Sequence, residues 1–337
     1  SIRQAQDKLS IFKPSPLAQS PNRPIVYHLG DNVATRKAYG NALVRLYPKF
    51  PAIVALDGEV SNSTYADIFK KAYPERFFEM FIAEQNMVGA ALGLSRRGNI
   101  PFVSSFAAFF TRAFDQIRMC QYSDANIKFV GSHAGVSIGE DGASQMGLEE
   151  ISMFRAIHGS VVLYPSDAVS TEALVEAAAE HHGMVYLQTT RMETPVIYGA
   201  SETFSIGGSK TIRESANDVV TVFAAGITVH EAIRAHEALK KENILIRIVD
   251  MYSIKPLDAA VIKKACQETN ALIVAEDAYP EGALYEAICG SGAVTRPTYS
   301  LAVRKMPKTG KPAELLSYED IDAAAIVKKV KEIVIER

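Results

Sequence analysis

The sequence has few cysteines, no long apolar run and no excess of basic residues, and these shortages exclude several classes of protein. Its three cysteines are odd in number and have no metal-ligand spacing, which is typical of reduced thiols in a cytoplasmic protein. No apolar run approaches the ~20 residues of a membrane span, and the N-terminus has no apolar signal-peptide segment. The net charge of −2 leaves no basic excess, so we expect no binding to nucleic acid or to a membrane surface.

Three further patterns are missing: a catalytic triad, a zinc-ligand spacing and a dinucleotide-binding glycine fingerprint. What is present is an ordinary globular composition, with 337 residues of which 48% are hydrophobic and 22% charged. Such a chain is long enough for two domains with separate cores. Residues 9–26 carry four prolines and no periodicity, which predicts an extended arm or linker.

Strand-like and helical patterns alternate along most of the chain, which predicts an α/β fold. Six apolar strand-like runs precede a break near 195–218, where Gly207-Gly208 and scattered polar residues interrupt the alternation. A second alternation starts at Val219 and ends with a helix over 321–335. We predict an arm over 1–30, a six-stranded parallel-sheet domain over 31–196, a linker over 197–217 and a smaller α/β domain over 218–337. The six strands are expected at 52–56, 78–83, 100–104, 127–131, 161–164 and 184–189.

Polar and aromatic residues gather just after the predicted strands, where ligands of parallel sheets bind. Asp167 reads as a helix cap, but capping does not explain the others. In chain order the whole set is Glu59, Ser63, Glu84, Phe106, Phe109, His133, Asp141, Asp167 and Arg191.

Glu84 stands where an apolar strand is predicted to become a helix. Desolvation in a dry pocket disfavours a charged carboxylate more strongly than a helix N-terminus favours it. We therefore expect a neutral carboxyl group, of the kind that a nitrogen-containing aromatic ring could use. The alternative is an ordinary solvated glutamate at the start of a helix.

Residues 131–145 pack four glycines, His133, Glu140 and Asp141 into fifteen positions, and we call them the glycine loop. Tight or positive-φ turns are expected there. His133 and Asp141 are then candidate hydrogen-bond partners for a polyhydroxylated substrate, and the alternative is a loop whose polar groups bond to one another.

Phe106 and Phe109 follow a strand end, where a flat heteroaromatic ring could stack on them, although aromatic residues at this spacing also form cores. Ser63 and Arg191 follow other strand ends, and a guanidinium there is a good phosphate clamp. His181-His182 is interpreted as the end of a helix and not as a metal site.

Three stretches resemble transketolase, specifically the half with the pyrimidine-binding and C-terminal domains. They are residues 82–87, with the sequence Ile-Ala-Glu-Gln-Asn-Met, residues 105–116 around Phe106 and Phe109, and residues 132–145. The resemblance runs from about Asp31 to the C-terminus. It implies a thiamine diphosphate enzyme that moves two-carbon ketol units between sugar phosphates.

The resemblance also implies roles for individual residues. Glu84 would protonate the pyrimidine ring, with Phe106 and Phe109 stacked on that ring and Gln145 near its amino group. Glu59 falls where the family commonly has an aspartate near the cofactor. The implied substrate ligands are His133 and Asp141 for sugar hydroxyls and Arg36, Ser63, His133 and Arg191 for the terminal phosphate, with His133 also catalytic.

The family's Gly-Asp-Gly…Asn site for the diphosphate and its metal is missing from this chain. Asp57-Gly58 with Asn86 imitates it, but Leu56 replaces the first glycine and Asn86 belongs to the helix of Glu84. We therefore expect a split transketolase, in which an N-terminal subunit binds the diphosphate with Mg²⁺ or Ca²⁺ and this chain holds no metal. Two chains of each kind would form a two-fold heterotetramer. Two alternatives stay open, a beta-type subunit of a 2-oxo acid dehydrogenase or related ketosynthase and a non-catalytic interaction protein of the same fold.

Overall fold

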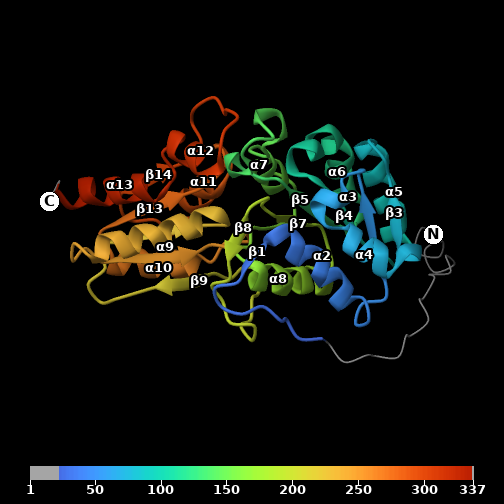
Figure 1. Cartoon of the computed structure of the whole chain (residues 1–337), viewed down its shortest axis with the longest axis horizontal. Coiled ribbons are helices and arrows are strands. Elements are labelled where there is room, and N and C mark those ends of the chain that lie inside the picture. The colour runs from blue at the N-terminus through green and yellow to red at the C-terminus, as the bar shows by residue number, and fades with distance from the viewer. Residues whose placement is uncertain (1–22, 336–337) are drawn as a thin grey trace.

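The structure is a computed structural model that describes residues 23–335, so the predicted arm lies largely outside the described residues. The protein is an α/β protein with two domains, each built on its own sheet (Figure 1). Figure 1 shows the N-terminal domain in blue to green and the C-terminal domain in yellow to red, with α7 and α12 near the junction. No helix within residues 23–335 is long and apolar enough to cross a membrane.

The N-terminal sheet has the strand order β12-β6-β7-β5-β4-β2-β3, and all six predicted strands are present. These six run parallel to their neighbours, as predicted. The seventh, β12, comes from the C-terminal part of the chain and pairs antiparallel with β6, so a sheet of six strands alone was wrong. The strands are β2 (Ile53–Asp57), β3 (Phe77–Glu79), β4 (Ile100–Phe106), β5 (Lys128–Ser132), β6 (Val161–Leu163), β7 (Val185–Gln188) and β12 (Ser253–Lys255).

Helices cover both faces of this sheet, because its central strands bury side chains on both sides. On β2, Ile53 and Ala55 face one core and Val54 and Leu56 the other. The first core is shared with α2 (Thr35–Leu46), α4 (Asp67–Ala72) and α8 (Ala168–Glu180). The second is shared with α5 (Glu84–Arg96), α6 (Phe114–Cys120) and α7 (Glu150–Arg155).

Short helical elements connect the strands to the longer helices. They are α3 (Ser61–Thr64), η1 (Pro74–Arg76), η2 (Ala107–Ala113), η3 (Gln121–Ser123), η4 (Val136–Ile138) and η5 (Ala143–Gln145). Three of them, α3, η2 and η5, carry the candidates Ser63, Phe109 and Gln145. A two-stranded antiparallel sheet joins β1 (Asn32–Ala34) to β8 (Glu193–Pro195). The predicted cap of α8 is confirmed, since Asp167 accepts a hydrogen bond from the backbone N–H of Ser170 at 2.7 Å.

The strand predicted before Glu84 ends four residues early. β3 stops at Glu79, and Phe81 adopts a positive φ of 55° that no strand can contain. The side chains of Phe81 and Ile82 are 64% and 73% exposed. The apolar run from 78 to 83 therefore forms one edge strand and an exposed loop, because this edge of the sheet has no described neighbour to cover it.

The C-terminal sheet has the order β14-β13-β10-β11-β9 and is parallel except for β9. Its helices α9 and α13 share one core, and α10 and α11 cover the other face. The segment predicted as a linker contains β9, so it is partly ordered within this sheet. The elements are β9 (Lys210–Arg213), β10 (Val220–Ala224), β11 (Ile246–Asp250), β13 (Ala271–Ala275), β14 (Thr298–Leu301), α9 (Ile227–Lys240), α10 (Ala259–Glu268), α11 (Leu284–Cys289), α12 (Pro312–Tyr318) and α13 (Ala323–Ile335).

Candidate active site

Arg36, Ser63 and Arg191 are far apart in the sequence but meet at the carboxyl edge of the N-terminal sheet. Arg36 lies in the first turn of α2 and donates from Nη1 to the backbone oxygen of Ser63 at 2.6 Å. Its Nε donates to the backbone oxygen of Arg191 at 3.2 Å. Burial lowers the pKa of Arg36, and the nearby Arg191 cation lowers it further. Two guanidinium groups therefore stand close together at one half-buried edge.

The side chain of Arg191 links this edge to the glycine loop. Its Nη1 donates to the backbone oxygen of Ile138 at 2.8 Å, and its Nε lies 3.3 Å from Oδ2 of Asp141. Exposed Glu140 is a further acceptor, 3.4 Å from Nη1. Carboxylates that neutralise a guanidinium at the surface are groups that an incoming anion can displace. We call Arg36, Ser63, His133, Asp141 and Arg191 the arginine cluster.

His133 is the buried member of this cluster and has a positive φ of 58°. Its Nδ1 lies 2.9 Å from Oγ of Ser132, and its Nε2 lies 3.8 Å from Oδ2 of Asp141, beyond hydrogen-bond distance. Burial lowers the pKa of His133 to about 3, helped by the Arg36 and Arg191 cations. The imidazole is therefore neutral at physiological pH and can serve a ligand as a hydrogen-bond donor or acceptor.

A second set, which we call the aromatic cluster, consists of Glu84, Phe106, Phe109 and Gln145. The η2 segment contacts both α5, which begins with Glu84, and η5, which ends with Gln145. The Phe106 ring stacks on Phe109 at a centroid distance of 5.1 Å and on His133 at 3.8 Å. Phe106 thus joins the two clusters and keeps little free surface, whereas Phe109 is half-buried and retains some.

Glu84 is 2% exposed, as the prediction of a dry environment required. Its Oε2 nevertheless accepts a hydrogen bond from Nη1 of Arg112 at 3.1 Å, although the Arg112 side chain is 60% exposed. The Arg112 guanidinium therefore already occupies one oxygen of the Glu84 carboxyl group. Sequence reasoning missed Arg112, because this pair joins α5 to η2 and no single-element spacing reveals it.

Glu59 does not join either cluster. Its side chain is exposed, its φ is 65° and its backbone N–H donates to Oε1 of Glu79. The buried carboxylate at this strand end is Asp57, whose oxygens accept hydrogen bonds from Val60 N and Thr64 Oγ1, both at 2.7 Å. Burial raises the pKa of Asp57 to about 7. The one sequence signal for Asp57 was its place directly after the strand predicted at 52–56.

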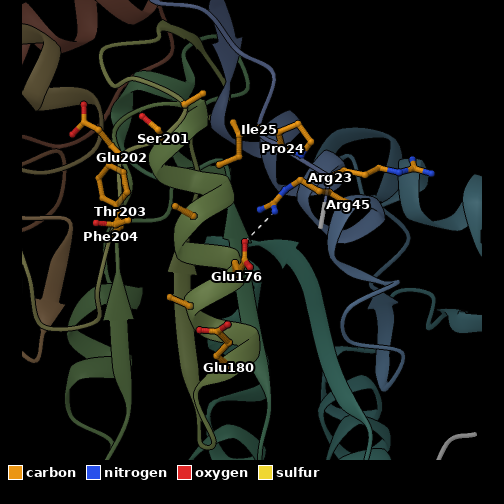
Figure 2. A pocket seen from close by; sticks show the side chains of 13 residues that line it. Arg23, Pro24, Ile25, Arg45, Glu176, Glu180, Ser201, Glu202, Thr203 and Phe204 are labelled. Carbon is orange, nitrogen blue, oxygen red and sulfur yellow. Dashed lines mark hydrogen bonds and ion pairs between the residues drawn. The ribbon is translucent and has the colours of Figure 1, made fainter. Parts of the chain in front are cut away.

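None of these residues lines the pocket drawn in Figure 2, which has a volume of about 590 Å³. That pocket is lined by α8, by residues 23–25 and by residues 200–204. The ion pair of Arg45 with Glu176, at 3.0 Å, forms part of its wall. Across residues 23–335, no group of three or more His, Cys, Asp and Glu side chains is arranged to hold a metal ion.

Both domains match domains of known proteins. Residues 31–196 match the transketolase pyrimidine binding domain, and residues 209–326 match the transketolase C-terminal domain. A structure described as a split gene transketolase, an inactive beta4 tetramer, superposes with a TM-score of 0.81. It is 36% identical in sequence, and the match covers 90% of this chain and 98% of that chain. The chain belongs to the transketolase family.

Longer transketolases contain the same half. Transketolase from Homo sapiens is 47% identical over an alignment of 345 positions, which covers 98% of this chain and 55% of the human protein. Transketolase-like protein 2 from Mus musculus is 52% identical over 317 residues, which cover 92% of this chain and 50% of that protein. The chain spans about half the length of the curated relatives it matches. The family resemblance predicted from the sequence is thereby confirmed.

Proposed function

We propose that this chain is one subunit of a split transketolase. It would act with a partner subunit that binds the diphosphate and the divalent metal, in a two-fold heterotetramer, and transfer a two-carbon ketol unit from a ketose phosphate to an aldose phosphate. The observation that carries the proposal is the meeting of two guanidinium groups, a neutral buried imidazole and a carboxylate beside an aromatic cluster.

The arginine cluster suits a phosphorylated sugar. Arg36 and Arg191 supply fixed cations for a terminal phosphate, which guanidinium groups bind with two parallel hydrogen bonds. His133 and Asp141 would bind the hydroxyl groups of the sugar, which need both hydrogen-bond donors and acceptors. Asp141 supplies acceptors, and the neutral His133 ring supplies either role. A lipoyl arm, the acceptor of a 2-oxo acid dehydrogenase, offers no phosphate for two arginines.

The aromatic cluster suits the pyrimidine ring of thiamine diphosphate. Phe109 offers ring surface for stacking, half-buried Gln145 offers an amide to the amino group, and the buried Glu84 carboxyl can exchange a proton with a ring nitrogen. When bound, thiamine diphosphate supplies the carbon nucleophile that takes up the two-carbon unit. Phe109 and Gln145 would hold the ring, and Glu84 would carry that one proton.

A relative that corresponds to this half alone supports the split arrangement, since it is described as inactive in a tetramer of beta subunits. The test is turnover of xylulose 5-phosphate with ribose 5-phosphate, in the presence of thiamine diphosphate and Mg²⁺. The chain is assayed alone, and then with a subunit that carries the diphosphate-binding half. We expect turnover only in the mixture, together with a native mass of two chains of each kind.

Each other outcome counts against a defined part of the proposal. Full turnover by the chain alone would refute the need for a partner. A mixture that assembles but turns over no sugar phosphate would refute the enzymatic role and favour an interaction protein. Reaction of a 2-oxo acid with a lipoyl acceptor in that mixture would favour the dehydrogenase-type subunit.

A further inference from the structure

The C-terminal domain contributes no member of either cluster, yet one of its side chains reaches the glycine loop. Asp277 follows β13 and is fully buried. Its Oδ1 accepts a hydrogen bond from the backbone N–H of Val136 at 2.8 Å, and its Oδ2 accepts one from Ser137 at 3.2 Å. Both donors lie in the first turn of η4, in the middle of the glycine loop.

This contact replaces a missing helix cap. The first backbone N–H groups of a helical turn have no partner within the turn, and a side chain at the preceding residue usually accepts from them. In η4 that residue is Gly135, which has no side chain. The Asp277 carboxylate, which belongs to the second domain, therefore accepts the hydrogen bonds that a cap residue within the loop would otherwise accept.

The absence of a side chain at Gly135 lets the Asp277 carboxylate come close to the loop. The φ of Gly135 is 78°, and a Cβ atom built on it would lie 2.0 Å from Oδ2 of Asp277. Apolar packing follows the same seam, because Val136 and Ile138 share a buried cluster with Val303, Leu315 and Ile321 of the C-terminal domain. The carboxylate and this cluster together fix the loop against the second domain.

The loop carries the groups that the arginine cluster depends on. His133 lies three residues before Val136, Ile138 supplies the oxygen that holds Arg191, and Asp141 follows. We propose that Asp277 is a positioning residue, which holds the glycine loop so that these groups face a sugar phosphate. This inference rests on the proposed function for its effect on substrate and on the structure alone for its effect on the loop.

The first experiment measures amide exchange of Val136 and Ser137 in the full chain, for wild type and Asp277→Asn. The asparagine has one acceptor oxygen and turns an N–H₂ group toward the other donor, so we expect exchange about 10- to 100-fold faster at these amides. Asp258→Asn is the matched control, because Asp258 also accepts from two backbone amides, those of Ala260 and Val261, and contacts no part of the loop by hydrogen bond. Unchanged exchange at Val136 and Ser137 in Asp277→Asn would overturn the proposal.

A second variant approaches the same contact from the loop. Gly135→Ala should expel the carboxylate and speed the same amides, whereas Gly159→Ala should not, since Gly159 has a similar φ of 70° with open space around it. If the two changes break one contact, Asp277→Asn combined with Gly135→Ala should be no worse than either alone. Additive effects would contradict a shared contact.

The last measurement uses the assembled enzyme. Asp277→Asn should raise KM for ribose 5-phosphate about tenfold or more while kcat changes less, and Asp258→Asn should change neither. An unchanged KM in an active assembly would overturn the positioning role. Faster amide exchange together with an inactive wild-type assembly would count against the proposed function only and would leave the loop anchor supported.

Discussion

At the arginine cluster this chain builds nearly every contact itself, whereas at the aromatic cluster it leaves surface and partners open. Arg36 ties together two backbone oxygens, and Arg191 joins the glycine loop through Ile138 and Asp141. At the other cluster, Phe109 and Gln145 are only half-buried, and Glu84 is held by an arginine that is mostly exposed. The proposed function accounts for this difference, with substrate recognition preassembled in this chain and the cofactor site completed by another surface.

The largest expected effect tests the aromatic cluster. Glu84→Gln removes the group proposed to exchange a proton, so turnover of the assembled enzyme should fall by about 10²- to 10⁴-fold. Thermal unfolding of the chain should stay close to wild type, because glutamine keeps the size of the side chain. The control is Glu75→Gln at an exposed position of η1. Wild-type turnover by Glu84→Gln would show that this carboxyl has no part in the reaction.

The next effect tests the arginine cluster. Arg191→Met removes a charged hydrogen-bond donor, so KM for ribose 5-phosphate should rise about 10- to 100-fold with a smaller change in kcat. Arg213→Met, on β9 of the other domain, serves as the control. If KM for unphosphorylated ribose rises by the same factor, Arg191 does not recognise the phosphate.

The pH dependence of stability reports on His133. In the unfolded chain this histidine takes a proton near its usual pKa of about 6.5, whereas burial and two cations lower its pKa in the folded chain to about 3. The unfolded state therefore binds the proton first, and stability present above pH 6.5 is lost as pH falls toward 3. Between pH 7 and pH 5 this amounts to about 2 kcal/mol.

His133→Asn should remove this loss, and asparagine tolerates the positive φ at that position. Denaturant unfolding at pH 7 and pH 5 measures the difference. The exposed His158 provides the control, because His158→Asn should lose as much stability as wild type. An equal loss in His133→Asn would mean that His133 is not the group that titrates.

Much of this arrangement could be predicted from the sequence, because periodic apolar runs determine where parallel strands and helices lie. The predicted strand ends placed Ser63 and Arg191 at one edge of the sheet, and the glycines of the loop indicated tight turns around His133 and Asp141. Together these signals indicated most of the arginine cluster. The error at residues 78–83 arose because an apolar run cannot show whether a neighbour covers it. Arg112 and Asp277 were missed because each acts on an element far away in the sequence, and Asp57 because its burial depends on the sheet around it.

The smallest expected effect sharpens the comparison at Glu84 itself. Arg112→Met removes the guanidinium that now holds Oε2, while the methionine keeps the aliphatic stem. The pair is solvated at its arginine end, so the free energy of unfolding should change by less than about 1 kcal/mol. Because Arg112 competes for the carboxyl, its removal should tighten thiamine diphosphate binding to the assembled enzyme by up to about fivefold. Titration calorimetry measures this affinity, with Arg118→Met on α6 as the control. Weaker binding in Arg112→Met would instead mean that Arg112 helps to hold the cofactor, and the aromatic cluster would then be more complete within this chain than the comparison states.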